Sequence, residues 1–224
     1  MKSIRPIIPG LLLLALFFVF TLLVCFVDVQ PIGVALSEVG FASLNGSVND
    51  FFGAHKSLYT VTEILGYLTW GVVAFFGLLG LSQLVHRKSL LKVDRDIILL
   101  GIGYAVMLVF YVLFDKLPLN YRPAYPWDEG ALEASYPSSH TLMLVFVMAT
   151  AVIQIMRRMR KGTLRTVLTV ACIAVAAVVV VGRMACGVHW FTDIIGGLLL
   201  AAALSALYYG LIGDTGAKAE NARS

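Results

Sequence analysis

The stretch "GRMACGVHWFTD", residues 182–193, carries an arginine, a histidine and an aspartate between two apolar runs, at about 164–182 and 192–212. Each run has about 20 residues, the length that an α-helix needs to cross the hydrocarbon of a bilayer. Ionisable side chains are costly near hydrocarbon, and where they occur they usually serve a function. The stretch therefore predicts two membrane helices joined by a short turn that carries chemistry.

The composition of the whole chain is that of a membrane protein. Of its 224 residues, 59% are hydrophobic and 13% are charged, and the mean hydropathy is +0.88. Soluble domains carry about 25% charged residues. The first apolar run, about 7–27, is too long for the apolar part of a typical signal peptide, and no small-x-small cleavage site follows it. We therefore expect an uncleaved first span.

Six stretches are long and apolar enough, or nearly so, to be spans: about 7–27, 60–85, 97–114, 140–156, 164–182 and 192–212. They predict an all-α fold, an integral membrane six-helix bundle that forms a single transmembrane domain over residues 1–212. Within the first outer loop, a segment at about 30–55 has spaced apolar residues typical of an interfacial helix. Its "NGS", at 45–47, fits either a glycosylation acceptor or a turn. Residues 213–224 are expected to form a short disordered cytoplasmic tail.

The net charge of +4 is explained by membrane topology, so it does not indicate a nucleic-acid partner. Cytoplasmic loops of membrane proteins hold the excess of Lys and Arg. With the N-terminus inside, 13 of the 17 Lys and Arg residues fall on the cytoplasmic side. The four on the outer side are Lys56, Lys116, Arg122 and Arg183. Both termini are therefore predicted to be cytoplasmic.

The order of the spans brings distant ionisable residues to one membrane face. Spans 3 and 5 run outward, whereas spans 4 and 6 begin outside. We expect the following residues to meet at the extracytoplasmic face: Lys116, Arg122, His140, Arg183, His189 and Asp193.

These residue types suit phosphoryl transfer. One lysine and two arginines, Lys116, Arg122 and Arg183, can surround a phosphate and stabilise the charge on its oxygens. Ser138 and Ser139 precede a predicted helix, where free backbone N–H groups attract an anion. Taken singly, an interfacial Lys or Arg is usually an anchor whose charge reaches for the interface, and "PSSH" is an ordinary helix cap. Their convergence on one face favours a phosphate site.

Two histidines and a carboxylate supply the acid–base and nucleophilic chemistry. His189 and Asp193 are four residues apart, so on a helix they share a face and can hydrogen-bond. A carboxylate on one ring nitrogen leaves the other nitrogen as a nucleophile. His140 would then protonate the leaving oxygen as general acid. The His189–Asp193 pair taken alone fits a structural hydrogen bond equally well.

Three segments together resemble the signature of the type-2 phosphatidate phosphatase superfamily, which includes lipid phosphate phosphatases, bacterial polyprenyl diphosphate phosphatases and the vanadium haloperoxidases. They are "KLPLNYRP" (116–123), "YPSSH" (136–140) and "GRMACGVHWFTD" (182–193). The resemblance implies a phosphate site made of Lys116, Arg122, Ser138, Ser139 and Arg183. It implies that His189 is the nucleophile that forms a phosphohistidine, His140 the acid and Asp193 the residue that orients the nucleophile. No metal and no cofactor are implied.

The chain departs from the family pattern in three places. Five residues separate Lys116 from Arg122, where the pattern has six, which puts the role of Lys116 in doubt. Ser139 stands where the pattern has glycine, and Gly182 stands where it has serine before Arg183.

The sequence thus predicts a metal-independent phosphatase in the plasma membrane, a multi-pass protein whose active site faces the outer leaflet. Its substrate would be a lipid phosphate or diphosphate in the bilayer, with polyprenyl diphosphate first and phosphatidate or phosphatidylglycerophosphate next. A lipid phosphotransferase using the same site is the alternative within enzymes. A transporter or channel is disfavoured because the central parts of the six spans lack ionisable residues. An inactive lipid-binding relative is disfavoured by the intact set of His140, His189 and Asp193.

Overall fold

A computed structural model describes residues 5–123 and 133–213, and in this part of the chain it is all-α. Six helices are long and apolar enough to cross a membrane: α1 (Ile8–Phe26), α3 (Lys56–Arg87), α4 (Arg95–Lys116), α5 (Ser139–Arg158), α6 (Thr163–Ala185) and α7 (Phe191–Ile212). The predicted fold class and all six predicted spans are confirmed, with ends that differ by a few residues. Of the tail predicted at 213–224, only residue 213 lies in the described part.

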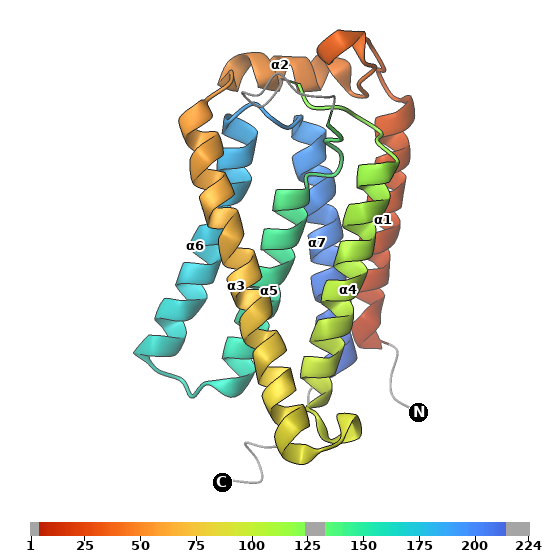
Figure 1. Cartoon of the computed structure of the whole chain (residues 1–224). Helices are drawn as coiled ribbons and strands as arrows, with labels where there is room; N and C mark the ends of the chain where they lie inside the picture. The colour runs from red at the N-terminus through yellow and green to blue at the C-terminus, as the bar shows by residue number, and fades with distance from the viewer. Residues whose placement is uncertain (1–4, 124–132, 214–224) are drawn as a thin grey trace.

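Helices α5 and α7 form the centre of the bundle, as Figure 1 shows. Half of the residues in their apolar windows are buried, against 22% or fewer in the other four spans. The outer helices present large apolar side chains on their surfaces, including Leu12, Leu78, Val109 and Leu164. Such a surface suits contact with lipid, because apolar side chains in water would be costly.

Two glycines let α7 pack closely against the start of α5. A Cβ at Gly196 would lie 2.6 Å from the Tyr136 ring, and one at Gly197 would lie 2.9 Å from the Ser138 carbonyl oxygen. Both distances are shorter than real Cβ contacts, so a larger residue would push α7 away. The pair therefore sets the short separation between the segments that carry His140 and Asp193.

The segment between α1 and α3, predicted to be the first outer loop, contains a short helix, α2 (Ala42–Phe52), which lies across one end of the bundle in Figure 1. Asn45 in this helix is fully buried, and its side-chain oxygen accepts a hydrogen bond of 3.1 Å from the backbone of Thr192 at the start of α7. Its amide nitrogen donates to the Thr192 hydroxyl at 2.9 Å. The "NGS" at 45–47 is thus helical and not a turn. In the folded protein its asparagine clamps α2 to α7 and is inaccessible to glycosylation.

The ends of the helices follow the predicted parity. The C-terminal ends of α4 and α6 and the N-terminal ends of α5 and α7 lie at the end of the bundle that α2 covers (Figure 1). The C-terminal end of α7 lies at the opposite end, where Gly210 packs against Pro6 in the short helical turn Arg5–Ile7. That this opposite end is cytoplasmic stays a prediction.

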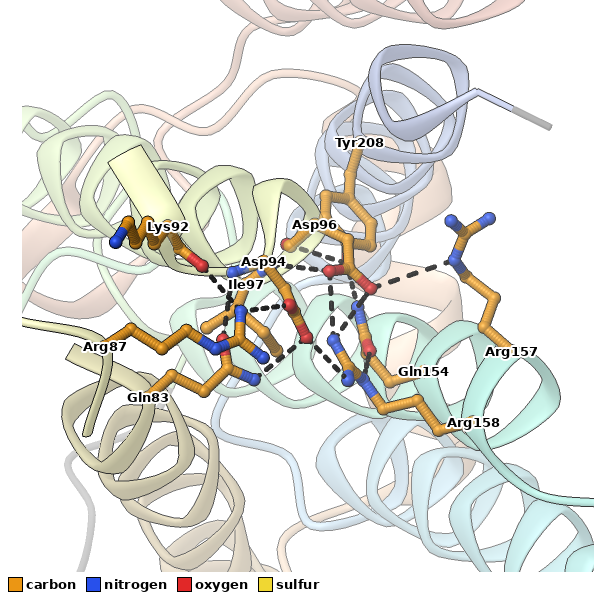
Figure 2. Close-up of polar contacts among 10 residues, drawn as sticks. All are labelled: Gln83, Arg87, Lys92, Asp94, Asp96, Ile97, Gln154, Arg157, Arg158 and Tyr208. Carbon is orange, nitrogen blue, oxygen red and sulfur yellow. Dashed lines mark hydrogen bonds and ion pairs between the residues drawn. The ribbon is translucent and has the colours of Figure 1, made fainter. Parts of the chain in front are cut away.

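At the opposite end, a network of ion pairs and hydrogen bonds joins α3, α4, α5 and α7 (Figure 2). Arg158 on α5 donates two hydrogen bonds, of 3.0 and 2.9 Å, to the Asp96 carboxylate on α4. Asp94, the cap of α4, accepts from Arg87 on α3 at 2.7 Å. This Arg87 hydrogen bond holds the pKa of the Asp94 carboxyl below its ordinary value. Gln154 on α5 donates to the Tyr208 hydroxyl on α7. The network fixes the relative positions of four helices far from the other end.

We expect Asp96→Asn to lower stability while leaving catalysis intact in the folded protein. The change removes the charge that Arg158 pairs with at 2.9 Å, and losing one partner of such a contact costs about 1–3 kcal/mol. The thermal unfolding midpoint in detergent should fall by several degrees. Arg160→Gln, at an exposed position nearby, is the matched control and should unfold like wild type. An unchanged midpoint for Asp96→Asn would show that the network does not stabilise the bundle.

Candidate active site

Three hydrogen bonds hold the three sequence segments together at the end of the bundle that α2 covers. The Asn120 amide donates to the Asp193 carboxylate at 3.4 Å. The Trp190 indole donates to the Tyr121 carbonyl at 2.7 Å. The Ser138 backbone N–H donates to the Asp193 carbonyl at 2.9 Å. These contacts join the three segments at one end of the bundle, where the order of the spans predicts that they meet.

His189 lies in the turn between α6 and α7 and is 4% exposed. Its Nδ1 is 3.6 Å from the Asp193 carboxylate, slightly beyond hydrogen-bond distance. The same carboxylate oxygen accepts a hydrogen bond of 2.8 Å from the backbone of Trp190, which fixes Asp193 in the first turn of α7. Asp193 therefore lies beside the imidazole, but His189 precedes α7 and the predicted hydrogen bond is not made at this distance. That Asp193 orients the imidazole stays a prediction.

The His189 ring is held neutral by its surroundings. Burial, together with the positive charges of Arg122 and Arg183, holds the pKa of the His189 imidazole well below its usual range. The charge of His140 acts on the ring in the same direction. A neutral imidazole has a free electron pair, which is the form that a nucleophile requires.

His140 occupies the first turn of α5, where the Ser138 hydroxyl caps the helix by accepting from the Thr141 backbone at 3.4 Å. Its Nε2 lies 3.2 Å from the carboxylate of Glu63 on α3. Its Nδ1 is buried and has no hydrogen-bond partner among the described residues. One ring nitrogen is therefore oriented by a carboxylate, and the other is available to a ligand.

The two arginines have matching environments. Nη2 of Arg122 pairs with Glu133 at 2.9 Å, and Nη2 of Arg183 pairs with Glu63 at 2.5 Å. Nε and Nη1 of both arginines are buried and lack partners within the described ranges. Arg183 is fully buried, and its guanidinium lies 5.2 Å from the centre of the Tyr59 ring. These four nitrogens are donors that an anion could accept from, because guanidinium groups bind oxyanions through such pairs of N–H groups.

The other predicted phosphate ligands differ in their placement. Ser139 is the first residue of α5 and lines the two cavities described below. Lys116 is not brought to the arginines by any contact among the described residues. Its side chain is 76% exposed, and its ammonium pairs with the neighbouring Asp115 at 3.2 Å. Of the predicted phosphate ligands, Lys116 is therefore the one that the tertiary structure leaves outside the cluster.

Two adjoining cavities lie beside the cluster. The first, of about 370 Å³, is lined by residues that include Arg122, Glu133, Tyr136 and Ser139. The second, of about 250 Å³, is lined by Glu63, Gly66, Tyr67, Thr69, Trp70, Tyr111, Ser139, His140 and Met143. Tyr111 and Ser139 line both, so a polar space beside Arg122 adjoins a more apolar one along α3.

Sequence reasoning missed two residues of the site. Glu63 lies within the span predicted at 60–85, and an ionisable residue inside a span is a sequence signal of function that could identify it. Asn120 lies within the segment 116–123, but its contact with Asp193 depends on how that segment folds back on α7. No comparable signal in the sequence identifies it.

No group of three or more His, Cys, Asp or Glu side chains within residues 5–123 and 133–213 is arranged to hold a metal ion. That the protein works without a metal stays a prediction. The arrangement itself consists of a neutral imidazole, a second imidazole and two arginines with free donors. It can bind an anion and attack it.

A family model described as the PAP2 superfamily matches residues 8–216. The chain belongs to this superfamily. The match covers nearly all of the membrane domain and confirms the resemblance on which the sequence prediction rests. The PAP2 chain also resembles a solved structure whose title is "Crystal structure of the first transmembrane PAP2 type phosphatidylglycerolphosphate phosphatase from Bacillus subtilis".

The likeness to the Bacillus subtilis structure has a TM-score of 0.64 at 17% sequence identity, and it covers 90% of this chain and 94% of that chain. At this identity the likeness shows a shared PAP2 membrane fold. A comparison with curated proteins found no match. The family and the fold together support a membrane phosphatase.

Proposed function

We propose that this PAP2 protein is a metal-independent lipid phosphate phosphatase that works through a phosphohistidine on His189. The observation that carries the proposal is the set of donors on Arg122 and Arg183 that have no partner among residues 5–123 and 133–213, beside a buried, neutral imidazole. An anion that accepts from both arginines would place its central atom near His189. A phosphate ester satisfies both requirements, since it is an anion and an electrophile.

The reaction has two steps. In the first, Nε2 of His189 attacks phosphorus, while Asp193 on the Nδ1 side orients the ring and stabilises the charge that it acquires. The bond from phosphorus to the leaving oxygen breaks, and His140 donates a proton to that oxygen. In the second, water attacks the phosphohistidine, His140 accepts a proton from the water, and inorganic phosphate leaves. Arg122 and Arg183 stabilise the charge on the phosphoryl oxygens in both steps.

The cavities favour an amphiphilic substrate. The second cavity follows α3 from Glu63 to Trp70, which corresponds to about 10 Å along a helix. Tyr67 and Trp70 line this part and are 70% and 51% exposed on the outside of the bundle. A lipid with its phosphate at the arginines can therefore extend its chain between α3 and α4 toward the bilayer.

We propose polyprenyl diphosphate as the first candidate substrate and phosphatidate or phosphatidylglycerophosphate as the next. With a diphosphate the leaving group is the lipid monophosphate, and with a monoester it is the lipid alcohol. The ranking of polyprenyl diphosphate rests on the resemblance to bacterial polyprenyl diphosphate phosphatases. The Bacillus subtilis structure, titled a phosphatidylglycerolphosphate phosphatase, supports the second group.

We further propose that the site faces the outer leaflet of the plasma membrane. The support is the distribution of charge, since 10 of the 14 Lys and Arg residues in the described part of the chain lie in or next to the loops at the end opposite the site. A membrane-impermeant thiol reagent should label Glu38→Cys, in the exposed part of the first outer loop, in intact cells. Labelling only after the membrane is permeabilised would contradict this orientation.

The experiment that tests the function is phosphate release by purified protein from a panel of lipid phosphates in detergent. The panel should contain polyprenyl diphosphate, phosphatidate and phosphatidylglycerophosphate. Release of inorganic phosphate without an added acceptor supports a phosphatase. Release that requires a second lipid or sugar as acceptor would instead show a phosphotransferase using the same site. The absence of release from every member, with and without acceptors, would overturn the proposal.

We expect vanadate to inhibit the enzyme and EDTA to leave it active. Vanadate adopts a five-coordinate geometry when an imidazole binds it, and the arginine donors would stabilise its oxygens as they stabilise a phosphoryl group. Chelation has no effect if the imidazole alone activates the phosphorus. The check is the rate of phosphate release at rising vanadate and in excess EDTA. A loss of activity in EDTA that Mg²⁺ or Zn²⁺ restores would show that the site needs a metal.

A further inference from the structure

One face of α3 is directed at the catalytic cluster, although no segment of the family signature lies on this helix. The face consists of Tyr59, Thr62, Glu63 and Gly66, at the spacing i, i+3, i+4 and i+7 that places residues on one side of a helix. Helix α3 contacts both α5 and α6, which carry His140 and Arg183. This face of α3 therefore lies against the helices that carry two of the site residues.

Its small and aromatic members keep α3 close to the site. A Cβ at Gly66 would lie 3.1 Å from Cδ2 of the His140 ring, so the glycine leaves room for the imidazole against α3. A Cβ at Gly182 would lie 2.5 Å from the Thr62 methyl group. The departure from serine at 182 therefore accompanies the close approach of α6 to α3. Tyr59 covers the Arg183 guanidinium at 5.2 Å.

The charged member of the face contacts two site residues with a single oxygen. Oε1 of Glu63 is 3.2 Å from Nε2 of His140 and 2.5 Å from Nη2 of Arg183. The Glu63 side chain is 31% exposed, whereas that of Arg183 is fully buried. The carboxylate thus reaches from α3 into the contact between α5 and α6 and joins the acid to a phosphate-binding arginine.

We propose that Glu63 is a positioning residue for the reaction, one that holds His140 by Nε2 and Arg183 by Nη2. Its role toward His140 parallels that of Asp193 toward His189, so that each catalytic histidine has its own carboxylate. The proposal rests on the function proposed above and assigns to that site a residue outside its three segments.

The free atoms of the site favour a positioning role over a competing one. A carboxylate occupying the place of the phosphate would use up the donors that bind phosphate. With Glu63 in contact, Nε and Nη1 of Arg183 and Nδ1 of His140 still lack partners among the described residues. The donors that a substrate needs are therefore the ones that Glu63 leaves free.

The proton balance identifies Nδ1 as the nitrogen of His140 that donates and accepts the proton. With Nε2–H donated to Glu63, the protonated ring carries its second proton on Nδ1. In the first step the Nδ1–H bond breaks and the proton passes to the leaving oxygen as the bond from that oxygen to phosphorus breaks. In the second step Nδ1 accepts a proton from the attacking water. Glu63 keeps its charge throughout, and by that charge it stabilises the imidazolium beside Arg122 and Arg183.

The charged groups that act on His140 come from each element around it. They are Glu63 on α3, Arg183 on α6 and Arg122 in the segment before α5, with His189 on the turn before α7. Among these, Glu63 is the group whose charge favours the protonated ring. When Glu63 is replaced by a neutral residue, His140 should therefore lose its proton at a lower pH than it does in the wild-type protein.

The test compares Glu63→Gln with wild type over a range of pH. We expect kcat to fall about 10- to 100-fold, at or below the lower limit of about 100-fold that general acid catalysis contributes, because the acid itself remains. The alkaline limb of the kcat profile should move to lower pH. Glu63→Asp should restore part of the activity and of the profile. Retention of the wild-type elution volume and thermal unfolding midpoint in detergent would show that the variant is folded.

Two matched variants complete the design. Glu133→Gln removes the carboxylate that pairs with Arg122 and contacts no histidine, so KM should rise while the alkaline limb stays in place. Glu38→Gln, at an exposed position in the first outer loop, should behave as wild type. If Glu63→Gln is folded and has the wild-type kcat and pH profile, the positioning role is wrong.

Tighter binding of vanadate by Glu63→Gln without a loss of kcat would also overturn the proposal, because it would identify the carboxylate as a competing anion.

Failure of the inference is distinguishable from failure of the proposed function. In the former case wild type releases phosphate and His189→Ala does not, whereas Glu63→Gln matches wild type. In the latter case wild type itself releases no phosphate.

Discussion

Replacing His189 by alanine should abolish phosphate release while the protein still inserts and folds. The ring is 4% exposed and its electron pair is free, so it is the group that attacks phosphorus in the proposed reaction. Without the nucleophile, only binding and charge stabilisation by Arg122 and Arg183 remain. We expect the rate to fall by at least about 1,000-fold, as is usual when a residue that acts as part of a catalytic unit is removed.

The measurement is phosphate release at saturating lipid phosphate, together with trapping of the intermediate. Wild type quenched in base after a brief reaction with phosphorus-labelled substrate should carry label that is stable to base and labile to acid, as expected for phosphohistidine. His189→Ala should carry none. His86→Ala, which alters an exposed histidine near the opposite end of α3, is the control. It should retain both the phosphate release and the base-stable label. Activity near wild type in His189→Ala would end the assignment of the nucleophile.

Arg122→Ala should be far more damaging than Lys116→Ala. Arg122 is 14% exposed in its side chain and has two buried nitrogens without partners in the described part of the chain. Removing one such donor of transition-state charge stabilisation lowers kcat/KM by about 100- to 1,000-fold. Lys116 is 76% exposed and pairs with Asp115 on the surface, and contacts of this kind contribute little, so we expect a change of less than about threefold.

The check is kcat/KM for both variants with the best substrate of the panel. Arg122→Lys adds information, because lysine keeps the charge but lacks the planar set of donors. It should recover only a small part of the activity. If Lys116→Ala proves the more damaging, the ammonium reaches the phosphate in the substrate complex despite its surface pairing here. The five-residue spacing to Arg122 would then still allow the family role.

Much of the site could be predicted because hydropathy constrains a membrane chain strongly. Each span must satisfy its backbone hydrogen bonds internally, so an apolar run of about 20 residues can only be a helix. Alternation of direction then decides which ends meet. His140, His189 and Asp193 could be placed at one end of the bundle on these grounds alone, without knowledge of any side-chain contact.

Residues whose role depends on contacts between helices could not be placed in the same way. The partner of Glu63 is decided by how α3 rotates about its axis and how closely Gly66 and Gly182 allow it to approach. Asn45 reads as a turn or a modification site in the linear sequence, yet burial makes it a clamp on α7. Lys116 shares a signature segment with Arg122, but the end of α4 leaves it on the surface.

The sequence by itself determined the number of spans and their alternation in direction, and with them which ionisable residues gather at one end of the bundle. It did so because transfer of backbone and charge into hydrocarbon carries costs that depend on residue type and not on neighbours. The tertiary structure alone decided which nitrogen of each arginine is held by a glutamate and which stays free for an anion. Such pairings depend on distances of a few ångströms between side chains far apart in the chain, and packing of the helices sets those distances.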